Sequence, residues 1–232
     1  MRQITPDIFM LEGLRIANVF LLVSPEGLTL VDCGVPGEAG KIASQITKAG
    51  YAITELRQVI ITHAHNDHTG SLKEIIRLSG AKVLAHQDEV PYLARTAKVP
   101  PMTGLQRFLF WLSAKLMPGP SAVAVDIALE DGEIVPGTGG FMAVHTPGHT
   151  PGSLCLYHPE RHILICGDAI INKHPLTGKK GLRESAATFS VNPAQMRESI
   201  RKLAGLEVDV LLSGHGEPIL ENASTLIRKV KY

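Results

Sequence analysis

One stretch decides the predicted fold and site: Thr62-His63-Ala64-His65-Asn66-Asp67-His68-Thr69-Gly70. Four residues with metal-ligand side chains fall within six positions, directly after the short apolar run Gln58–Thr62, which predicts a strand. Alternate residues of an extended segment point the same way, so His63 and His65 can bind one ion. Asp67 and His68 lie in the following turn, where both can face a second ion. The alternative is a histidine-rich surface loop, which this ligand spacing disfavours.

Three further segments have the same form, an apolar strand that ends in a turn carrying His or Asp beside glycine. They are Thr146–Ser153 with His149, Ile165–Asp168, and Leu212–Gly216 with His215. Glycine lets the backbone turn sharply and lets bulky side chains approach. A lone His or Asp after a strand is usually an ordinary turn residue, but four such segments in one chain argue against coincidence.

The remaining sequence predicts two rounds of strands followed by helices. Expected strands are Asp7–Leu11, Asn18–Ser24, Leu28–Asp32, Gln58–Thr62, Lys82–Ala85, Ile127–Leu129, Glu133–Val135, Phe141–His145, Ser153–Tyr157, His162–Cys166 and Asp209–Leu212. Expected helices are one from Val35 to Gly50 and others near Ser71–Ser79, Asp88–Ala97, Pro193–Leu203 and Glu221–Val230. Asp131-Gly132 predicts a hairpin that joins the strands on either side of it. The order favours two sheets packed face to face with helices outside both.

Length and composition fit a single domain without a nucleic-acid partner. The 232 residues suit one α/β domain, spanning residues 1–232, and contain no repeat or linker. Lys and Arg number 23 against 22 Asp and Glu, so no global field would attract nucleic acid. Without a signal-peptide pattern or an apolar run of about 18 residues, we expect no membrane span and a cytoplasmic location. Three cysteines in apolar surroundings are expected to be reduced.

Two segments do not fit the alternation of predicted strands and helices. Pro100–Pro120 is an apolar, helix-like insert that contains Phe108 and Trp111. It could cover the site and line the substrate pocket, pack as a core helix, or form the interface of a homodimer. Asn172–Asn192 is expected to be a long loop, and long loops inside compact domains are often functional, so its His174 is a candidate pocket residue.

The motifs occur in the order found in the metallo-β-lactamase superfamily, which the chain resembles from about Asn18 to Pro218. Val31-Asp32-Cys33-Gly34 is similar to the first motif of that family, an Asp that supports the ligand loop from behind. The resemblance implies an α/β (α+β) fold, the four-layer αββα sandwich. This agrees with the element order above.

Carried over position by position, the resemblance implies two divalent metal ions per chain, with zinc expected and iron or manganese as alternatives. It implies His63, His65 and His149 as ligands of the first ion, and Asp67, His68 and His215 as ligands of the second. Asp168 would bridge both. The other five histidines, among them His174, have no role in the motifs.

The implied activity is hydrolysis of an ester, lactone or thioester in a small molecule by a metal-bridging hydroxide. Asp67 would orient the nucleophile and pass a proton to the leaving group. True β-lactamases generally lack the bridging Asp. Only 17 residues follow His215, so we do not expect the helical C-terminal region of glyoxalase II. Lactonases that open acyl-homoserine lactones place Tyr three residues after the bridging Asp, where this chain has Ile171, a further candidate pocket residue.

Two rivals come from other functional classes. An iron-dependent persulfide dioxygenase needs one metal only, so the complete second ligand set favours hydrolysis. A non-catalytic metal-holding domain is the third possibility. Metal analysis combined with a panel of esters, thioesters and lactones would separate the three.

Overall fold

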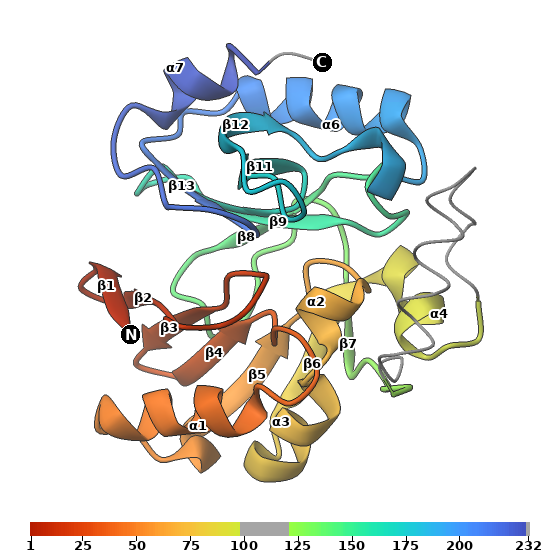
Figure 1. Cartoon of the computed structure of the whole chain (residues 1–232). Coiled ribbons are helices and arrows are strands. Elements are labelled where there is room, and N and C mark those ends of the chain that lie inside the picture. The colour runs from red at the N-terminus through yellow and green to blue at the C-terminus, as the bar shows by residue number, and fades with distance from the viewer. Residues whose placement is uncertain (98–120, 231–232) are drawn as a thin grey trace.

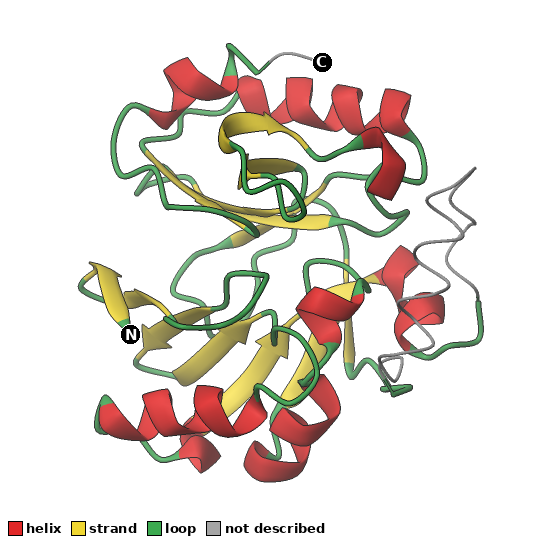
Figure 2. Cartoon of the chain, in the orientation of Figure 1, coloured by secondary structure: helices red, strands yellow, loops and turns green. Residues whose placement is uncertain are grey.

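The computed structural model describes residues 1–97 and 121–230. Two β-sheets face each other, with helices on the outer side of each, so the chain has the predicted four layers (Figures 1 and 2). The expected apolar insert at residues 100–120, with Phe108 and Trp111, lies outside the described residues.

The first sheet holds seven strands among the described residues, in chain order. They are β1 (Arg2–Thr5), β2 (Ile8–Met10), β3 (Phe20–Ser24), β4 (Gly27–Val31), β5 (Leu56–Ile60), β6 (Lys82–His86) and β7 (Ile127–Leu129). β4 to β7 are parallel to one another. The helices α1 (Ala39–Lys48) and α3 (Leu72–Ser79) cover the outer face, and α1 buries Ala39, Ile42 and Ile46 at helical spacing.

The second sheet has the order β13-β10-β9-β8 within the described part of the chain. Its strands are β8 (Met142–His145), β9 (Leu154–His158), β10 (Ile163–Gly167) and β13 (Val210–Ser213), and β10 pairs in parallel with β13. The outer face is covered by α6 (Pro193–Ala204) and α7 (Ala223–Ile227). The Asn192 side chain caps α6 by accepting from the backbone N–H of Gln195.

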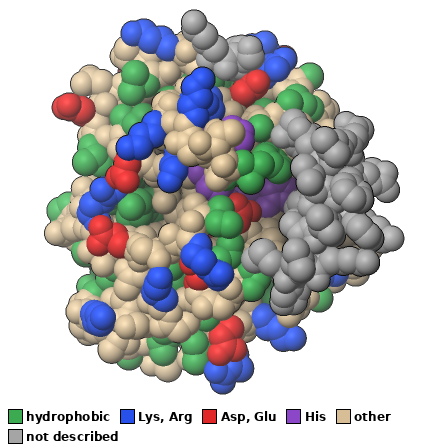
Figure 3. Space-filling model, in the orientation of Figure 1, with side chains coloured by type: hydrophobic (Ala, Val, Ile, Leu, Met, Phe, Trp, Pro, Cys, Tyr) green, Lys and Arg blue, Asp and Glu red, His purple; other side chains and the backbone are tan. Residues whose placement is uncertain are grey.

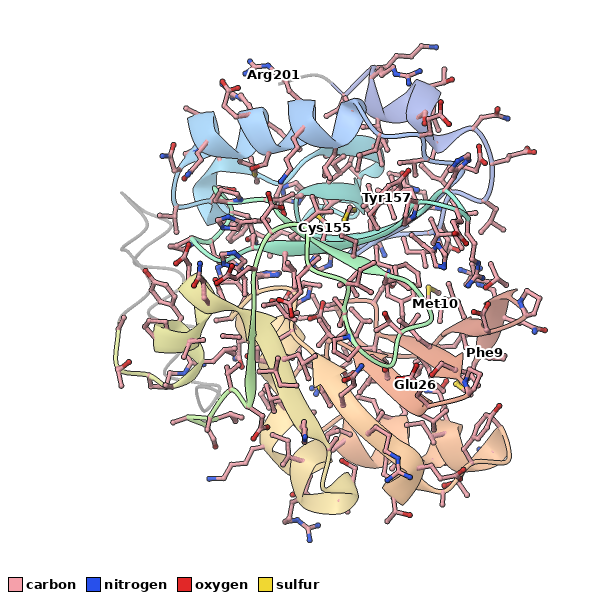
Figure 4. The ribbon with its side chains drawn as sticks, turned by 180° about the vertical axis from the view of Figure 1, so that it is seen from behind. Phe9, Met10, Glu26, Cys155, Tyr157 and Arg201 are labelled. Atoms are coloured by element: carbon pink, nitrogen blue, oxygen red, sulfur yellow. The ribbon has the colours of Figure 1, made fainter. Side chains whose placement is uncertain are left out.

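Three apolar clusters hold the layers together. The central one lies between the sheets and joins residues of both, among them Met10, Phe20, Phe141 and Leu156. A second cluster packs α1 and α3 on the first sheet, and a third packs α6 and α7 on the second. Figure 4, the view from behind, labels Met10 on the first sheet and Cys155 on the second sheet. Cys33, Cys155 and Cys166 are all free, as expected.

The predicted hairpin at Asp131-Gly132 is wrong. The strand Ile127–Leu129 pairs with β6 in the first sheet, whereas residues 133–135 bond to residues 141–143 next to the second sheet. Val135 N–H donates to Phe141 O at 2.8 Å. The turn therefore carries the chain from one sheet to the other, since each apolar run finds a partner in a different layer.

The predicted long loop Asn172–Asn192 is also wrong in part. The strands β11 (Ile170–Lys173) and β12 (Lys180–Glu184) form an antiparallel hairpin there, followed by η3 (Ala187–Phe189). His174 closes its turn, because its Nδ1 accepts from the N–H groups of Leu176 and Thr177, each at 3.2 Å. Gly178 has a φ of 68°, which suits such a tight turn.

The ends of several elements differ from the prediction. The helix expected at Asp88–Ala97 is η2 (Gln87–Glu89) followed by α4 (Val90–Leu93), and Arg95 follows with a left-handed φ of 57°. The last helix, α7, is shorter than expected, and β1, η1 (Ile53–Glu55) and α2 (Asn66–Thr69) had no counterpart in the predicted elements. Within residues 1–97 and 121–230, none of the helices has the length and apolar character needed to cross a membrane.

Candidate metal centre

The motif residues gather at one edge of the sandwich. His63 and His65 follow β5, and Asp67 and His68 lie on the short helix α2. His149 lies between β8 and β9, Asp168 follows β10, and His215 follows β13. The carboxyl ends of the parallel strands β4 and β5 in one sheet, and of β10 and β13 in the other, meet here. Binding sites of α/β proteins commonly form at such edges.

His63, His65 and His149 form the first group. Their ligand atoms lie within 4.8 Å of one another, and His63 Nε2 is 3.1 Å from His65 Nδ1. The rings of His63 and His149 are 4.7 Å apart and nearly perpendicular, at 77°. Three imidazole nitrogens that converge from two loops match the ligand set of a zinc ion.

Asp67, His68 and His215 form the second group. His215 Nε2 lies 3.4 Å from Asp67 Oδ2, and His68 Nε2 lies 3.8 Å from the same oxygen. Asp168 stands between the groups: its Oδ2 is 3.1 Å from His215 Nε2 and 3.7 Å from His149 Nε2, and its Oδ1 is 3.4 Å from His68 Nε2. One carboxylate thus faces both groups.

Hydrogen bonds behind the rings define which nitrogen of each histidine is free. Carbonyl and carboxylate oxygens only accept, so Nδ1 of His215 donates to Ile16 O at 3.2 Å, and Nδ1 of His68 donates to Asp32 Oδ2 at 2.7 Å. His63 Nδ1 donates to Thr62 Oγ1, which itself donates to Asp32. His149 Nδ1 lies 3.2 Å from Ser190 Oγ. Nε2 of each of these four rings is therefore left to face the centre, the arrangement typical of metal-binding histidines.

Asp32 lies behind the ligand residues and bonds to two of the segments that carry them. Its Oδ1 accepts from the Thr62 N–H at 2.9 Å, and its Oδ2 accepts from Thr62 Oγ1 and from His68 Nδ1. The residue is buried and has a left-handed φ of 62°, a conformation that is uncommon for any residue other than glycine. Strained backbone of this kind concentrates at functional sites.

The two groups differ in electrostatics. Burial, together with the neighbouring His65, lowers the pKa of His149 to about 3, and burial lowers the pKa of His63 well below its usual value. These rings are neutral at pH 7, the form that binds metal. Burial also opposes charge on His68 and His215, but facing carboxylates dominate and raise the pKa of His215 to about 10. The carboxylates that favour positive charge on these rings would equally favour a divalent cation.

The centre leaves no room for a side chain at position 214. A Cβ added to Gly214 would overlap Asp168 Oδ1 and would lie 2.9 Å from His68 Cε1. Glycine therefore allows the His215 loop to approach the two other ligand loops.

A metal ion fits these residues. Among the described residues, His68 Nε2, His149 Nε2 and Asp168 Oδ1 are buried polar atoms that have no hydrogen-bond partner. Buried polar atoms are nearly always paired, so three unpaired atoms at one point indicate a partner of another kind. The donors, imidazole nitrogens and carboxylate oxygens, are those that divalent ions take in proteins.

A separate group, His86, Asp88 and His145, has ligand atoms just as close together but different bonding. His86 Nδ1 accepts from the Asp88 N–H at 3.2 Å, and His145 Nε2 donates to Pro151 O at 2.9 Å. The two rings stack at 3.7 Å and 12°, so their planes are nearly parallel, whereas the rings of His63 and His149 are nearly perpendicular. We assign this group to the support of the neighbouring loops.

Two of the four candidate pocket residues, Ile171 and His174, lie in the described part of the chain. Ile171 is buried on β11, 1% exposed, opposite Arg183. His174 caps the hairpin turn, and Phe108 and Trp111 lie outside the described residues. A role for any of these four in substrate binding stays a prediction. Figure 3 shows histidine side chains reaching the surface among hydrophobic and acidic ones, and the partly exposed ligands are His65 and Asp67.

The comparisons with known proteins agree with this geometry. Residues 13–215 match the family profile described as "Metallo-beta-lactamase superfamily". The chain belongs to the metallo-β-lactamase superfamily. A Bacillus subtilis (strain 168) protein named "Probable metallo-hydrolase YflN" is 34% identical over 219 residues, covering 88% of this chain and 82% of the relative.

Two further relatives resemble the chain. A hydroxyacylglutathione hydrolase of Pseudomonas aeruginosa (strain LESB58) is 30% identical over 189 residues, which are 81% of this chain but 57% of that enzyme. This chain therefore spans little more than half the length of that relative. A solved structure of a metallo-beta-lactamase family protein from Thermus thermophilus superposes with a TM-score of 0.73 at 22% identity, covering 98% of this chain and 79% of the other. It shows the shared fold.

The superfamily and its named relatives identify this chain as a metal-dependent hydrolase. The four-layer fold predicted from the sequence is confirmed. Sequence reasoning overlooked four groups that hold the ligand loops: the Thr62 hydroxyl, the Ile16 carbonyl, Ser190 and the buried carboxylate of Glu89. Only Thr62 carried a signal, as the residue before the first histidine.

Proposed function

We propose that this protein hydrolyses a small ester, lactone or thioester with two divalent metal ions, and that both ions are zinc. The observation that carries the proposal is the position of Asp168 between two ligand groups, with its Oδ1 unpaired among the described residues. A single ion could also take Asp168 as a ligand together with two histidines. Two ions are favoured because Asp168 also faces His68 and His215, which with Asp67 supply a second ligand set.

The ligand assignment follows the two groups. His63, His65 and His149 would hold one ion; Asp67, His68 and His215 would hold the other; Asp168 would touch both. When bound, the ions would polarise a carbonyl group and lower the pKa of a water molecule from its bulk value towards ~7, so that hydrolysis proceeds at neutral pH.

Asp67 is the side chain best placed to handle protons. It is 26% exposed, whereas Asp168 is 7% exposed, so Asp67 is the more open carboxylate of the centre. Its Oδ2 can accept a hydrogen bond from the attacking water and so orient it toward the substrate. The same oxygen can then pass the proton to the departing alkoxide or thiolate.

Asp32, Thr62, Ser190 and Ile16 hold the histidines in their productive tautomers. Because each can accept a hydrogen bond from a protonated Nδ1, Nε2 is the nitrogen of each ring that is left for a metal. On His68 and His215, where carboxylates raise the pKa, a bound metal would displace the proton on Nε2. Rotation of the rings is restricted in the same way, so the ligand geometry exists before substrate binds.

A panel of substrates would identify which class of bond the protein cleaves. The relatives named hydroxyacylglutathione hydrolase favour a thioester, but this chain covers 57% of their length, so the panel must include esters and lactones. We expect zinc-loaded protein to hydrolyse at least one of these classes at neutral pH, measured by acid release or free thiol. Sulfite formation from a persulfide by iron-loaded protein, with no hydrolysis of the panel, would refute the proposal in favour of a dioxygenase. Zinc binding without either activity would indicate a metal-holding domain.

A further inference from the structure

Glu89 is a fully buried carboxylate outside the proposed ligand set. It is the last residue of η2, directly after β6, and is 0% exposed. A carboxylate in such a place is costly unless hydrogen bonds satisfy it, so its partners show why it is there.

Three donors converge on Glu89, and they come from two loops. Its Oε1 accepts from the Ala64 N–H at 2.7 Å. Its Oε2 accepts from Thr150 Oγ1 at 2.9 Å and from the Gly152 N–H at 2.8 Å. Ala64 lies between His63 and His65, while Thr150 directly follows His149. One oxygen therefore holds each of the two loops that carry the first ligand group.

The backbone is packed closely around this contact. A Cβ added to Gly152 would overlap the Glu89 backbone nitrogen, so the second loop rests directly on η2. Thr150 is held further, because its N–H donates to Ser153 Oγ at 2.9 Å. Burial raises the pKa of Glu89 to about 7, and the bonds from Ala64, Thr150 and Gly152 act in the opposite direction. The three donors suit an ionised carboxylate.

We propose that Glu89 is a positioning residue for the first metal: it fixes the spacing between the His63–His65 loop and the His149 loop. This inference rests on the proposed function for the identity of the ligands. Without the carboxylate, each loop would be held by its own contacts only. The three nitrogens would then have to be ordered when the metal binds, which lowers the affinity.

The test is a zinc affinity measurement that needs no substrate. Metal-free wild type, Glu89→Gln and Glu89→Ala are titrated with zinc against a chromophoric chelator. We expect Glu89→Ala to weaken binding at the first site by ~10-fold or more, the range found for groups that support ligands. Glu89→Gln should fall in between, because its amide keeps one acceptor oxygen and turns an NH₂ group toward one of the donors.

Two controls separate positioning from stability. Asp126→Asn changes a carboxylate that accepts from the Val83 N–H at 2.7 Å, beside β6 but away from the ligand loops, and should leave zinc affinity within ~2-fold. Ile42→Ala should lower stability, because Ile42 is buried in the apolar cluster that packs α1 and α3 on the first sheet, and it should also leave zinc affinity unchanged. If Glu89→Ala does not fold, Glu89→Gln and Thr150→Val, which removes one of the three bonds, carry the comparison.

Equal zinc affinity in wild type and the Glu89 variants would overturn the inference, as would an equal loss in Ile42→Ala. Reduced affinity in the Glu89 variants alone would support it. A wild type that binds zinc but hydrolyses nothing would refute the proposed function and leave the affinity comparison valid.

Discussion

Replacing Asp168 by asparagine should reduce turnover by more than ~10²-fold and weaken metal binding. Asparagine keeps the size of the side chain but loses its charge and one acceptor oxygen. In the structure the two carboxylate oxygens face the Nε2 atoms of His68, His149 and His215 at 3.1–3.7 Å, so an amide with one oxygen cannot serve both ligand groups. Turnover is measured with saturating metal, together with metal content.

The matched control is Asp7→Asn. The Asp7 carboxylate accepts two hydrogen bonds from Arg161 at 2.6 Å, near the opposite end of β10, and its loss should leave turnover nearly unchanged. Near-normal turnover of Asp168→Asn at full metal loading would show that this carboxylate does not bridge two ions.

Removal of the metal with a chelator should abolish turnover and lower the melting temperature by about 8–16 °C. A ligand that binds only the native state stabilises it by about 4 kcal/mol at ~1,000 times its Kd. In a chain of this size, 1 kcal/mol corresponds to roughly 2–4 °C. The effect has a structural reason, because His149 Nε2 and Asp168 Oδ1 are buried polar atoms without a hydrogen-bond partner among the described residues, and a bound metal would supply one.

The measurement is differential scanning calorimetry of protein with and without chelator, followed by zinc addition. Asp168→Asn should show a smaller shift, since it binds metal more weakly. A chelated protein with unchanged melting temperature and activity would contradict the prediction.

The candidate ligand residues could be selected from the sequence because each stands in a local pattern, and the structure brings them close together. A buried strand followed by a turn containing glycine is visible without tertiary structure, as at Leu212–Gly216. Parallel strands with their carboxyl ends at one edge then bring the turns together. The four-layer fold could be predicted for the same reason, since the alternation of apolar runs and helices is local.

The groups that hold the ligands could not be predicted, because their roles depend on packing between distant segments. Glu89 bonds to Gly152, 63 residues away, and His215 bonds to Ile16, 199 residues away. The prediction of a hairpin at Asp131-Gly132 was wrong for a related reason. A turn signal reports that the chain reverses direction, but the partner of each strand is decided by the sheet that buries it.

The metal content of the purified protein tests the central claim most directly. Elemental analysis should find close to two divalent ions per chain, and His68→Ala or His215→Ala should each remove the ion of the second group, leaving close to one. Both variants remove nitrogens that face Asp67 and Asp168, and they leave the three histidines of the first group in place. One tightly bound iron ion per chain, unaffected by either substitution, would contradict a dinuclear hydrolase.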